Sequence, residues 1–181
     1  AQAPAAAIYQ VACHTTGGDF TLQIHRGWAP HGADRFHELV ASGYYSGNAF
    51  YRVVRGFVAQ WGLSPNPADS ARWRRQPIPD DPVLHSNLEG TISFAANGPR
   101  SRTSEVFINL RDNHRLDGSG FAPFGQVVAG MATVRELSSE YGDTPPGGHG
   151  PDPRLVYSRG ADYLTRQFPR LDVIYYCRVL P

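Results

Sequence analysis

The 181-residue chain contains no lysine, so all 17 of its basic side chains are arginines. This absence excludes a P-loop lysine, a Schiff-base lysine and a kinase-type lysine. Cysteine is also scarce, with Cys13 near one end of the chain and Cys177 near the other. In an oxidising compartment the two cysteines could form a disulfide, whereas in a reducing compartment they would be two buried thiols.

Long apolar runs are missing as well. No stretch approaches the roughly 18 residues of a membrane-spanning helix, so no membrane span is predicted. The net charge of +1 gives no electrostatic reason to expect nucleic acid or an anionic membrane as a partner. One basic cluster, residues 72–75, is interpreted as a solvated loop.

The patterns of several common catalytic sites are absent. The seven histidines show no metal-ligand spacing, so no metal site is predicted. Neither Ser64 nor Ser119 completes the G-x-S-x-G motif of a hydrolase. Asp80 and Asp81 are interpreted as a solvated turn before Pro82 rather than as a catalytic carboxylate pair. We therefore expect no nucleophile, metal or cofactor.

The chain begins with AQAPAAA, a small and featureless segment that we predict to be a disordered remnant over residues 1–7. A-x-A is the pattern found around signal-peptidase sites, which favours export to the periplasm or the medium. A trimmed terminus would look similar. Residues 8–181 have the length and the 41% hydrophobic content of one globular domain.

Alternation of apolar and polar residues predicts a mainly β protein. The abundant glycine and proline, 19 and 15 residues, suit many short strands joined by turns. Three segments with helical spacing begin at Pro30, Met131 and Ala161, and residues 63–89 are predicted to be a long proline-rich connection. Strands are expected at residues 8–15, 19–25, on both sides of Gly56 in 50–62, and at 91–95, 105–110, 124–128 and 171–180.

The stretch 50–62 stands out because Arg52 and Gln60 lie among aromatic and β-branched residues. It is followed in order by GTISFA at 90–95, Gly98-Pro99, SEVFI at 104–108, LDG at 116–118 and FGQVVAGM at 124–131. Together these blocks resemble the cyclophilin-type peptidyl-prolyl cis-trans isomerases, over nearly the whole chain from about Tyr9 to Val179.

This resemblance implies a closed eight-stranded antiparallel β-barrel capped by two or three α-helices. It also implies a cofactor-free isomerase that rotates X-Pro peptide bonds in protein clients and so assists their folding. Proline-containing polypeptides are the expected partners, and a monomer is the expected state. The alternative is a prolyl-peptide binding module with little turnover.

The resemblance also assigns roles to individual residues. Arg52 matches the family's catalytic donor, Gln60 the amide that orients it, and Phe57, Phe107 and Leu116 its proline pocket. The remaining positions that match the substrate groove are Val58, Ala95, Ala96 and Phe121. In an arbitrary β protein, the aromatic residues of this set would most simply be core residues. Only the occurrence of the whole set in the family's order favours a substrate-binding site.

Three departures from the family pattern affect the predicted function. Arg115 stands where the family often carries a tryptophan associated with tight cyclosporin binding, so weak cyclosporin binding is expected. Glu105 replaces a usual glutamine, and residues 63–89 lack the usual glycine-rich segment. The last two features favour the binding-module alternative, and they leave the preferred residue before proline open.

Overall fold

An eight-stranded antiparallel sheet forms the body of the protein in the computed structural model, which describes residues 4–181. The strands follow the order β3-β4-β6-β5-β7-β2-β1-β8, and every pair of neighbours is antiparallel. Their bounds are β1 Ile8–Thr15, β2 Gly18–His25, β3 Arg52–Val54, β4 Val58–Trp61, β5 Thr91–Phe94, β6 Val106–Asn109, β7 Gly125–Ala129 and β8 Ile174–Val179. The predicted mainly β fold with eight antiparallel strands is confirmed.

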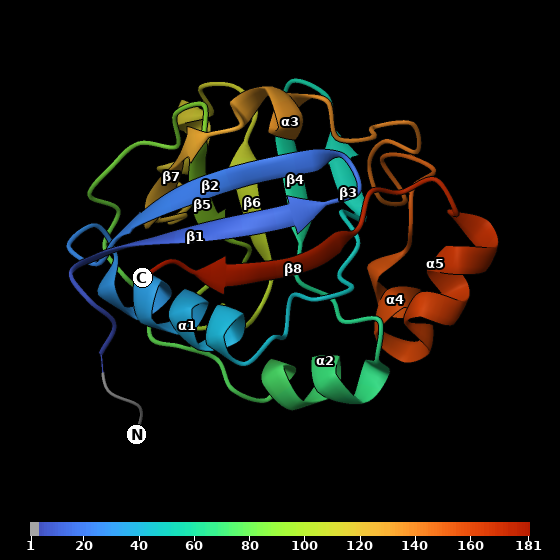
Figure 1. The fold of residues 1–181 in the computed structure, drawn as a ribbon, viewed down its shortest axis with the longest axis horizontal. Helices are drawn as coiled ribbons and strands as arrows, with labels where there is room; N and C mark the ends of the chain where they lie inside the picture. Colours follow the sequence, from blue (N-terminus) through green and yellow to red (C-terminus); the bar gives the residue numbers. More distant parts are fainter. Residues whose placement is uncertain (1–3) are drawn as a thin grey trace.

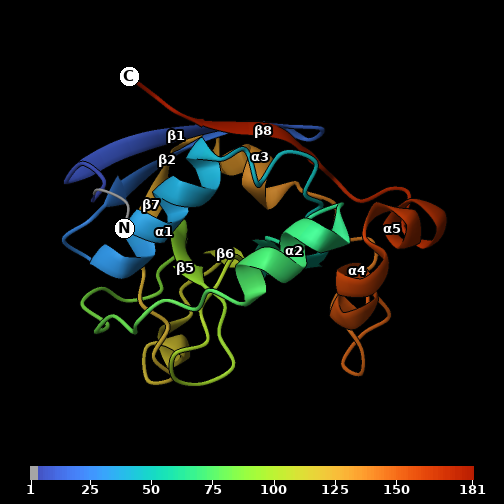
Figure 2. The same ribbon diagram turned by 90° about the horizontal axis from the view of Figure 1, so that it is seen from below.

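The two edge strands of this sheet, β3 and β8, approach each other because the sheet curls (Figure 1, Figure 2). The segment just before β3 is hydrogen-bonded through its backbone to the chain at the start of β8. Gly47 N–H donates to Ile174 O at 2.8 Å, Ile174 N–H to Asn48 O at 2.8 Å, and Phe50 N–H to Asp172 O at 2.9 Å. These bonds draw the edges together, which leaves little edge open to other chains.

Residues 4–181 contain five α-helices, more than the two or three that were predicted. They are α1 Pro30–Ala41, α2 Pro67–Arg74, α3 Met131–Arg135, α4 Pro153–Arg159 and α5 Ala161–Gln167, with a 3₁₀ turn at His114–Leu116. In Figure 1, α1 lies below the strands, α3 above them, and α4 and α5 at one end. None of these helices is long and apolar enough to cross a membrane.

The unexpected helices α2 and α4 share a start signal. In each, a side-chain oxygen caps the first turn and proline follows: Asn66 accepts from Ala68 N–H, and Asp152 accepts from Arg154 N–H, both at 3.0 Å. Proline at the first helical position is favourable because its missing N–H would be unpaired there anyway. Both helices are only about two turns long, which is too short for a clear apolar stripe.

The predicted solvated loop at residues 72–75 is wrong for Trp73, which is only 6% exposed. Trp73 lies in the last turn of α2 and packs edge-on against Tyr44 with ring centroids 6.0 Å apart. The guanidinium of Arg35 stacks on it at 5.2 Å. Burying a side chain of this size is worth about 1.5–3 kcal/mol, so Trp73 anchors α2 to the barrel.

The predicted solvated turn at Asp80 and Asp81 is wrong for Asp81, which is buried. Its carboxylate accepts hydrogen bonds from His31 N–H at 3.2 Å and Gly32 N–H at 2.9 Å, in the first turn of α1. It also pairs with Arg102 Nη2 at 3.0 Å. A carboxylate at this place satisfies free N–H groups and complements the helix dipole.

Both ends of the domain are attached to its body. A disulfide joins Cys13 in β1 to Cys177 in β8, where the two residues are directly opposite in the register. The predicted disordered remnant lies partly outside the described residues, which begin at residue 4. Within the described part, Ala5 N–H donates to Asp34 Oδ1 at 3.0 Å and Ala7 O accepts from Arg26 N–H at 2.9 Å.

Candidate active site

The β3–β4 hairpin sets the geometry of the site. Gly56 turns the chain with φ of 70°, which favours glycine. The resulting register places Arg52 directly opposite Gln60, and the next pairing places Gln60 opposite Phe107 on β6. Because side chains directly opposite each other in an antiparallel sheet lie on one face, these three residues form a row across three strands.

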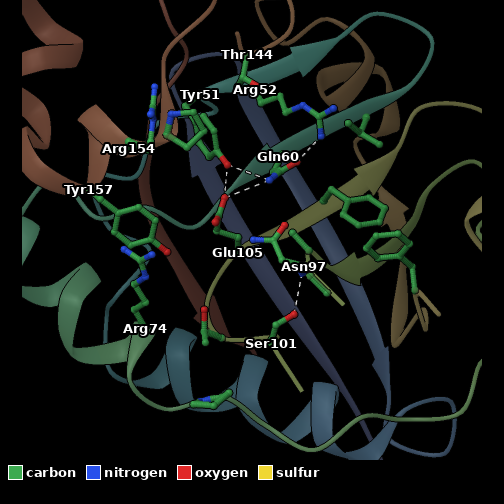
Figure 3. A pocket seen from close by; sticks show the side chains of 18 of the residues that line it. Tyr51, Arg52, Gln60, Arg74, Asn97, Ser101, Glu105, Thr144, Arg154 and Tyr157 are labelled. Carbon is green, nitrogen blue, oxygen red and sulfur yellow. Dashed lines mark hydrogen bonds between the residues drawn. The ribbon is translucent and has the colours of Figure 1, made fainter. Parts of the chain in front are cut away.

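This row lies in a groove of about 1000 Å³ (Figure 3). The structure brings all nine predicted site residues together along its lining: Arg52, Phe57, Val58, Gln60, Ala95, Ala96, Phe107, Leu116 and Phe121. A cavity of this volume is typical of ligand sites, and it exceeds what a single prolyl ring would fill.

The guanidinium of Arg52 is held from two sides. Its Nη1 donates to Gln60 Oε1 at 3.0 Å, while its Nε and Nη2 donate to the carboxylate of Asp143 at 2.7 and 3.4 Å. Its Cζ lies 5.7 Å from the centre of the Phe57 ring. The planar fork of arginine therefore has a fixed orientation beside an apolar surface.

That apolar surface is a pocket made by aromatic and aliphatic side chains from three different segments. Phe107 is 5% exposed and meets Phe121 edge to face, with ring centroids 5.6 Å apart. Leu116 comes from the 3₁₀ turn, and Phe57 from the hairpin. Asn113 Nδ2 donates to Phe57 O at 2.9 Å, which ties the hairpin to the segment that carries Leu116.

Gln60 is fixed in turn by Tyr51 and Glu105. Its Nε2 donates to Tyr51 Oη at 2.9 Å and to Glu105 Oε1 at 3.1 Å, and Tyr51 donates its hydroxyl to the same carboxylate oxygen (Figure 3). Burial raises the pKa of Glu105 above its ordinary value, although these hydrogen bonds act in the opposite direction. Because an amide has one donor end and one acceptor end, this network also orients the oxygen of Gln60 toward Arg52.

The chain matches one family of known proteins. The family model for "Cyclophilin type peptidyl-prolyl cis-trans isomerase/CLD" matches residues 10–152. Peptidyl-prolyl cis-trans isomerase 10 of Caenorhabditis elegans is 33% identical over 135 residues, which cover 71% of this chain and 81% of the relative. The chain belongs to the cyclophilin-type peptidyl-prolyl cis-trans isomerases.

Solved cyclophilin structures share the fold. A cyclophilin-type isomerase of Cryptosporidium parvum superposes with a TM-score of 0.70 at 20% identity, covering 96% of this chain and 98% of that one. A second structure of a C. parvum cyclophilin-type isomerase, determined in the presence of the dipeptide Ala-Pro, gives a TM-score of 0.69 at 19% identity and covers 95% and 99%. These likenesses support the barrel architecture.

Asp143 is the site residue that the sequence did not indicate. It is 91 positions away from Arg52, in the segment between α3 and α4, and no local pattern marks it as a partner. Arg52 holds the pKa of Asp143 below its ordinary value through hydrogen bonds. In this cyclophilin the carboxylate is therefore ionised at neutral pH and makes an ion pair with the catalytic candidate.

The groove also extends beyond the predicted site, toward α2 and α4. This extension is lined by Ala71, Arg74 and Arg75 from α2 and its C-terminal end, and by Arg154 and Tyr157 from α4. Helix α4 lies entirely beyond residue 152, where the match to the cyclophilin family model ends. The family model therefore does not cover the part of this wall that α4 forms.

Proposed function

We propose that this groove rotates X-Pro peptide bonds in polypeptide clients, with Arg52 as the group that binds the twisted bond most strongly. The observation that carries the proposal is the fixed guanidinium of Arg52, held by Gln60 and Asp143 next to an apolar pocket. Proline needs a pocket of this kind, and the twisted bond needs a hydrogen-bond donor beside it.

The chemistry needs no nucleophile. Amide resonance gives the bond a rotation barrier of about 18–20 kcal/mol, while the two isomers of an X-Pro bond differ by only about 0.5–1 kcal/mol. Twisting the bond removes this resonance and leaves a lone pair on the proline nitrogen. A catalyst therefore has to bind the twisted state more tightly than either planar state.

Arg52 has the chemistry for that differential binding. Its guanidinium can donate to the proline nitrogen or to the neighbouring carbonyl as the bond twists. A hydrogen bond to a charged group is worth about 1.5–3 kcal/mol, which corresponds to roughly a ten- to hundredfold change in rate. Gln60 and Asp143 keep the donor in place, so little reorganisation is needed during the reaction.

The other groove residues would hold the substrate. The rings of Phe57, Phe107 and Phe121, together with Leu116, offer an apolar surface for the prolyl ring. The presence of Ala-Pro in the structure of the C. parvum relative supports this choice of ligand. Val58, Ala95 and Ala96 line the groove with small or β-branched side chains, which leaves room for an extended backbone.

The experiment is NMR measurement of cis–trans exchange in a short X-Pro peptide, with wild-type protein and with Arg52→Ala. We expect wild type to accelerate exchange and the variant to lose roughly ten- to hundredfold of that acceleration. A well-folded wild type that shifts the peptide resonances without faster exchange would support the binding module instead.

We also propose that the protein is exported and works as a monomer with weak affinity for cyclosporin. The disulfide between β1 and β8 supports export, because such bonds persist in oxidising compartments. It closes a loop of 164 residues, for which the chain-entropy model gives roughly 5 kcal/mol of stabilisation. Fractionation of the native host followed by thiol titration tests this, since a cytosolic protein with two free thiols would contradict export.

A further inference from the structure

The part of the groove beyond Glu105 is rich in positive charge. Four arginines line it away from Arg52, namely Arg74, Arg75, Arg100 and Arg154. Arg154 pairs with Asp152. Within residues 4–181, the other three form no ion pair.

Arg74 is the best placed of these side chains because both its backbone and its guanidinium are held. The buried ring of Trp73, its neighbour in sequence, anchors the end of α2. The guanidinium stacks on Tyr157 of α4, with Cζ 4.7 Å from the ring centre. Close by, Ala161 N–H at the start of α5 donates to Pro65 O at 3.0 Å, which ties the chain just after α4 to the chain just before α2.

The stack lies apart from the catalytic candidate. Figure 3 shows Arg74 and Tyr157 on one side of Glu105 and Arg52 on the other. Within residues 4–181, Glu105 forms no ion pair with Arg74, and its Oε1 accepts hydrogen bonds from Tyr51 and Gln60. The charge of Arg74 acts on Glu105 only at longer range, where it opposes the rise of the Glu105 pKa that burial causes. Among the described residues 4–181, no side chain forms an ion pair with Arg74, so its positive charge is available to the groove.

We propose that Arg74, stacked on Tyr157, binds an acidic side chain of the client polypeptide, an aspartate or glutamate close in sequence to the proline. This rests on the proposed function, because it assigns a substrate preference to the same groove. The groove's volume of about 1000 Å³ leaves room for residues next to the proline. Arginine and carboxylate are matched in charge and in hydrogen-bonding geometry.

The test uses peptides of the form acetyl-Ala-Ala-Ala-Pro-Ala-Ala-amide in which each alanine is replaced in turn by glutamate or by glutamine. The ratio of kcat/KM for the two members of each pair is measured by NMR exchange. We expect glutamate to be favoured about fivefold at one position, as for a partly exposed ion pair, and the ratio to fall toward one in 1 M salt.

Variants distinguish the contribution of Arg74 to the glutamate preference from the effect of the protein's overall charge. Arg74→Gln is expected to bring the ratio to about one, and Arg74→Lys to retain most of the preference. Arg178→Gln removes the same charge from the exposed face of β8, away from the groove, and is expected to leave the ratio unchanged. An equal loss in Arg178→Gln would overturn the inference.

The two proposals fail in different ways. A wild type that accelerates the alanine peptide but has a ratio of one at every position contradicts the acidic preference and leaves the isomerase intact. If wild type accelerates no peptide, the proposed function fails. The preference of glutamate over glutamine is then measured as the ratio of the two peptides' dissociation constants, obtained by NMR shift titration. A ratio of one in those constants would reject the role of Arg74 as well.

Discussion

Arg52 in β3 and Asp143 in the segment between α3 and α4 form an ion pair in which Nε donates to Oδ1 at 2.7 Å. The side chains of Arg52 and Asp143 are 26% and 34% exposed, so solvent partly screens the pair. The main effect of the ion pair is to orient the guanidinium of Arg52. Together with the bond to Gln60, it leaves the guanidinium little freedom to rotate away from Phe57.

The first prediction concerns Asp143 as a positioning residue. Asp143→Ala should lower kcat/KM about threefold, as expected for loss of a partly exposed ion pair, with most of the effect in kcat. Asp143→Asn keeps an acceptor for the Nε of Arg52 and should recover part of the kcat/KM that Asp143→Ala loses. A role of Asp143 in stabilising the fold alone does not predict this recovery of rate. Glu140→Gln, on the same segment but paired with exposed Arg170, serves as the control and should leave the rate unchanged.

The Arg52–Asp143 ion pair should be lost at low pH and not at high pH. Because the pKa of Asp143 is lowered in the folded protein, the pair is complete at any pH above the ordinary value of 3.8. Its contribution is lost only as the pH falls through the lowered pKa. Exchange rates of wild type and Asp143→Ala should therefore keep a constant ratio from pH 5 to 8, and a ratio that changes in this range would contradict the assignment.

The second prediction concerns Glu105, whose pKa is raised by burial. The folded protein then holds a proton that the unfolded chain releases, so stability falls as the pH rises from the ordinary value of 4.5 through the raised pKa. Glu105→Gln keeps an acceptor for Tyr51 and removes this titration. Urea unfolding should show the variant gaining free energy of unfolding over wild type between pH 4 and pH 7.5.

The control for Glu105 is Glu136→Gln, which changes an exposed residue of the same type. Its free energy of unfolding relative to wild type should change by less than about 0.5 kcal/mol over the same pH range. A Glu105→Gln variant whose advantage is constant with pH would show that the carboxyl does not titrate differently in the folded and unfolded states.

The third prediction concerns Arg115, whose Cζ lies 5.0 Å from the centre of the ring of Phe57, a residue of the apolar pocket. A tryptophan here would add a large rigid surface beside this pocket. Central tryptophans often contribute about 2 kcal/mol to binding, so Arg115→Trp should tighten cyclosporin binding by at least tenfold. Titration calorimetry measures this, with Arg111→Trp as a control; no gain in Arg115→Trp would reject the proposed reason for weak binding.

Some parts of this site could be predicted from the sequence and others could not. The β3–β4 hairpin has a clear two-residue period, and this period together with a turn at Gly56 places Arg52 and Gln60 on one face. Asp143 carries no such signal, because its partner lies 91 residues earlier and the pairing depends on the path of a whole loop. The sequence also did not predict Arg74 as a groove residue, because the sequence pattern of a basic cluster is the same whether an arginine faces solvent or a groove.

Asp81 shows the same limit outside the site. Locally it reads as a polar turn between prolines, yet its side chain is only 1% exposed. The partners that make its burial favourable are Arg102, 21 residues later, and the first turn of α1, about 50 residues earlier. Only the fold brings these groups together, so no pattern within the turn could distinguish a buried carboxylate from a solvated one.

The fourth prediction compares this buried pair with an exposed one. Asp81→Ala would leave Arg102, which is 5% exposed, without its charged partner and would uncap α1. Breaking a buried pair in this way typically costs about 3–5 kcal/mol. Glu140→Ala removes the partner of Arg170, which is 68% exposed, and should cost less than about 1 kcal/mol. Urea unfolding at pH 7 measures both. Similar losses in the two variants would mean that Asp81 is hydrated in solution and that the ordering of loop 77–82 does not depend on its carboxylate.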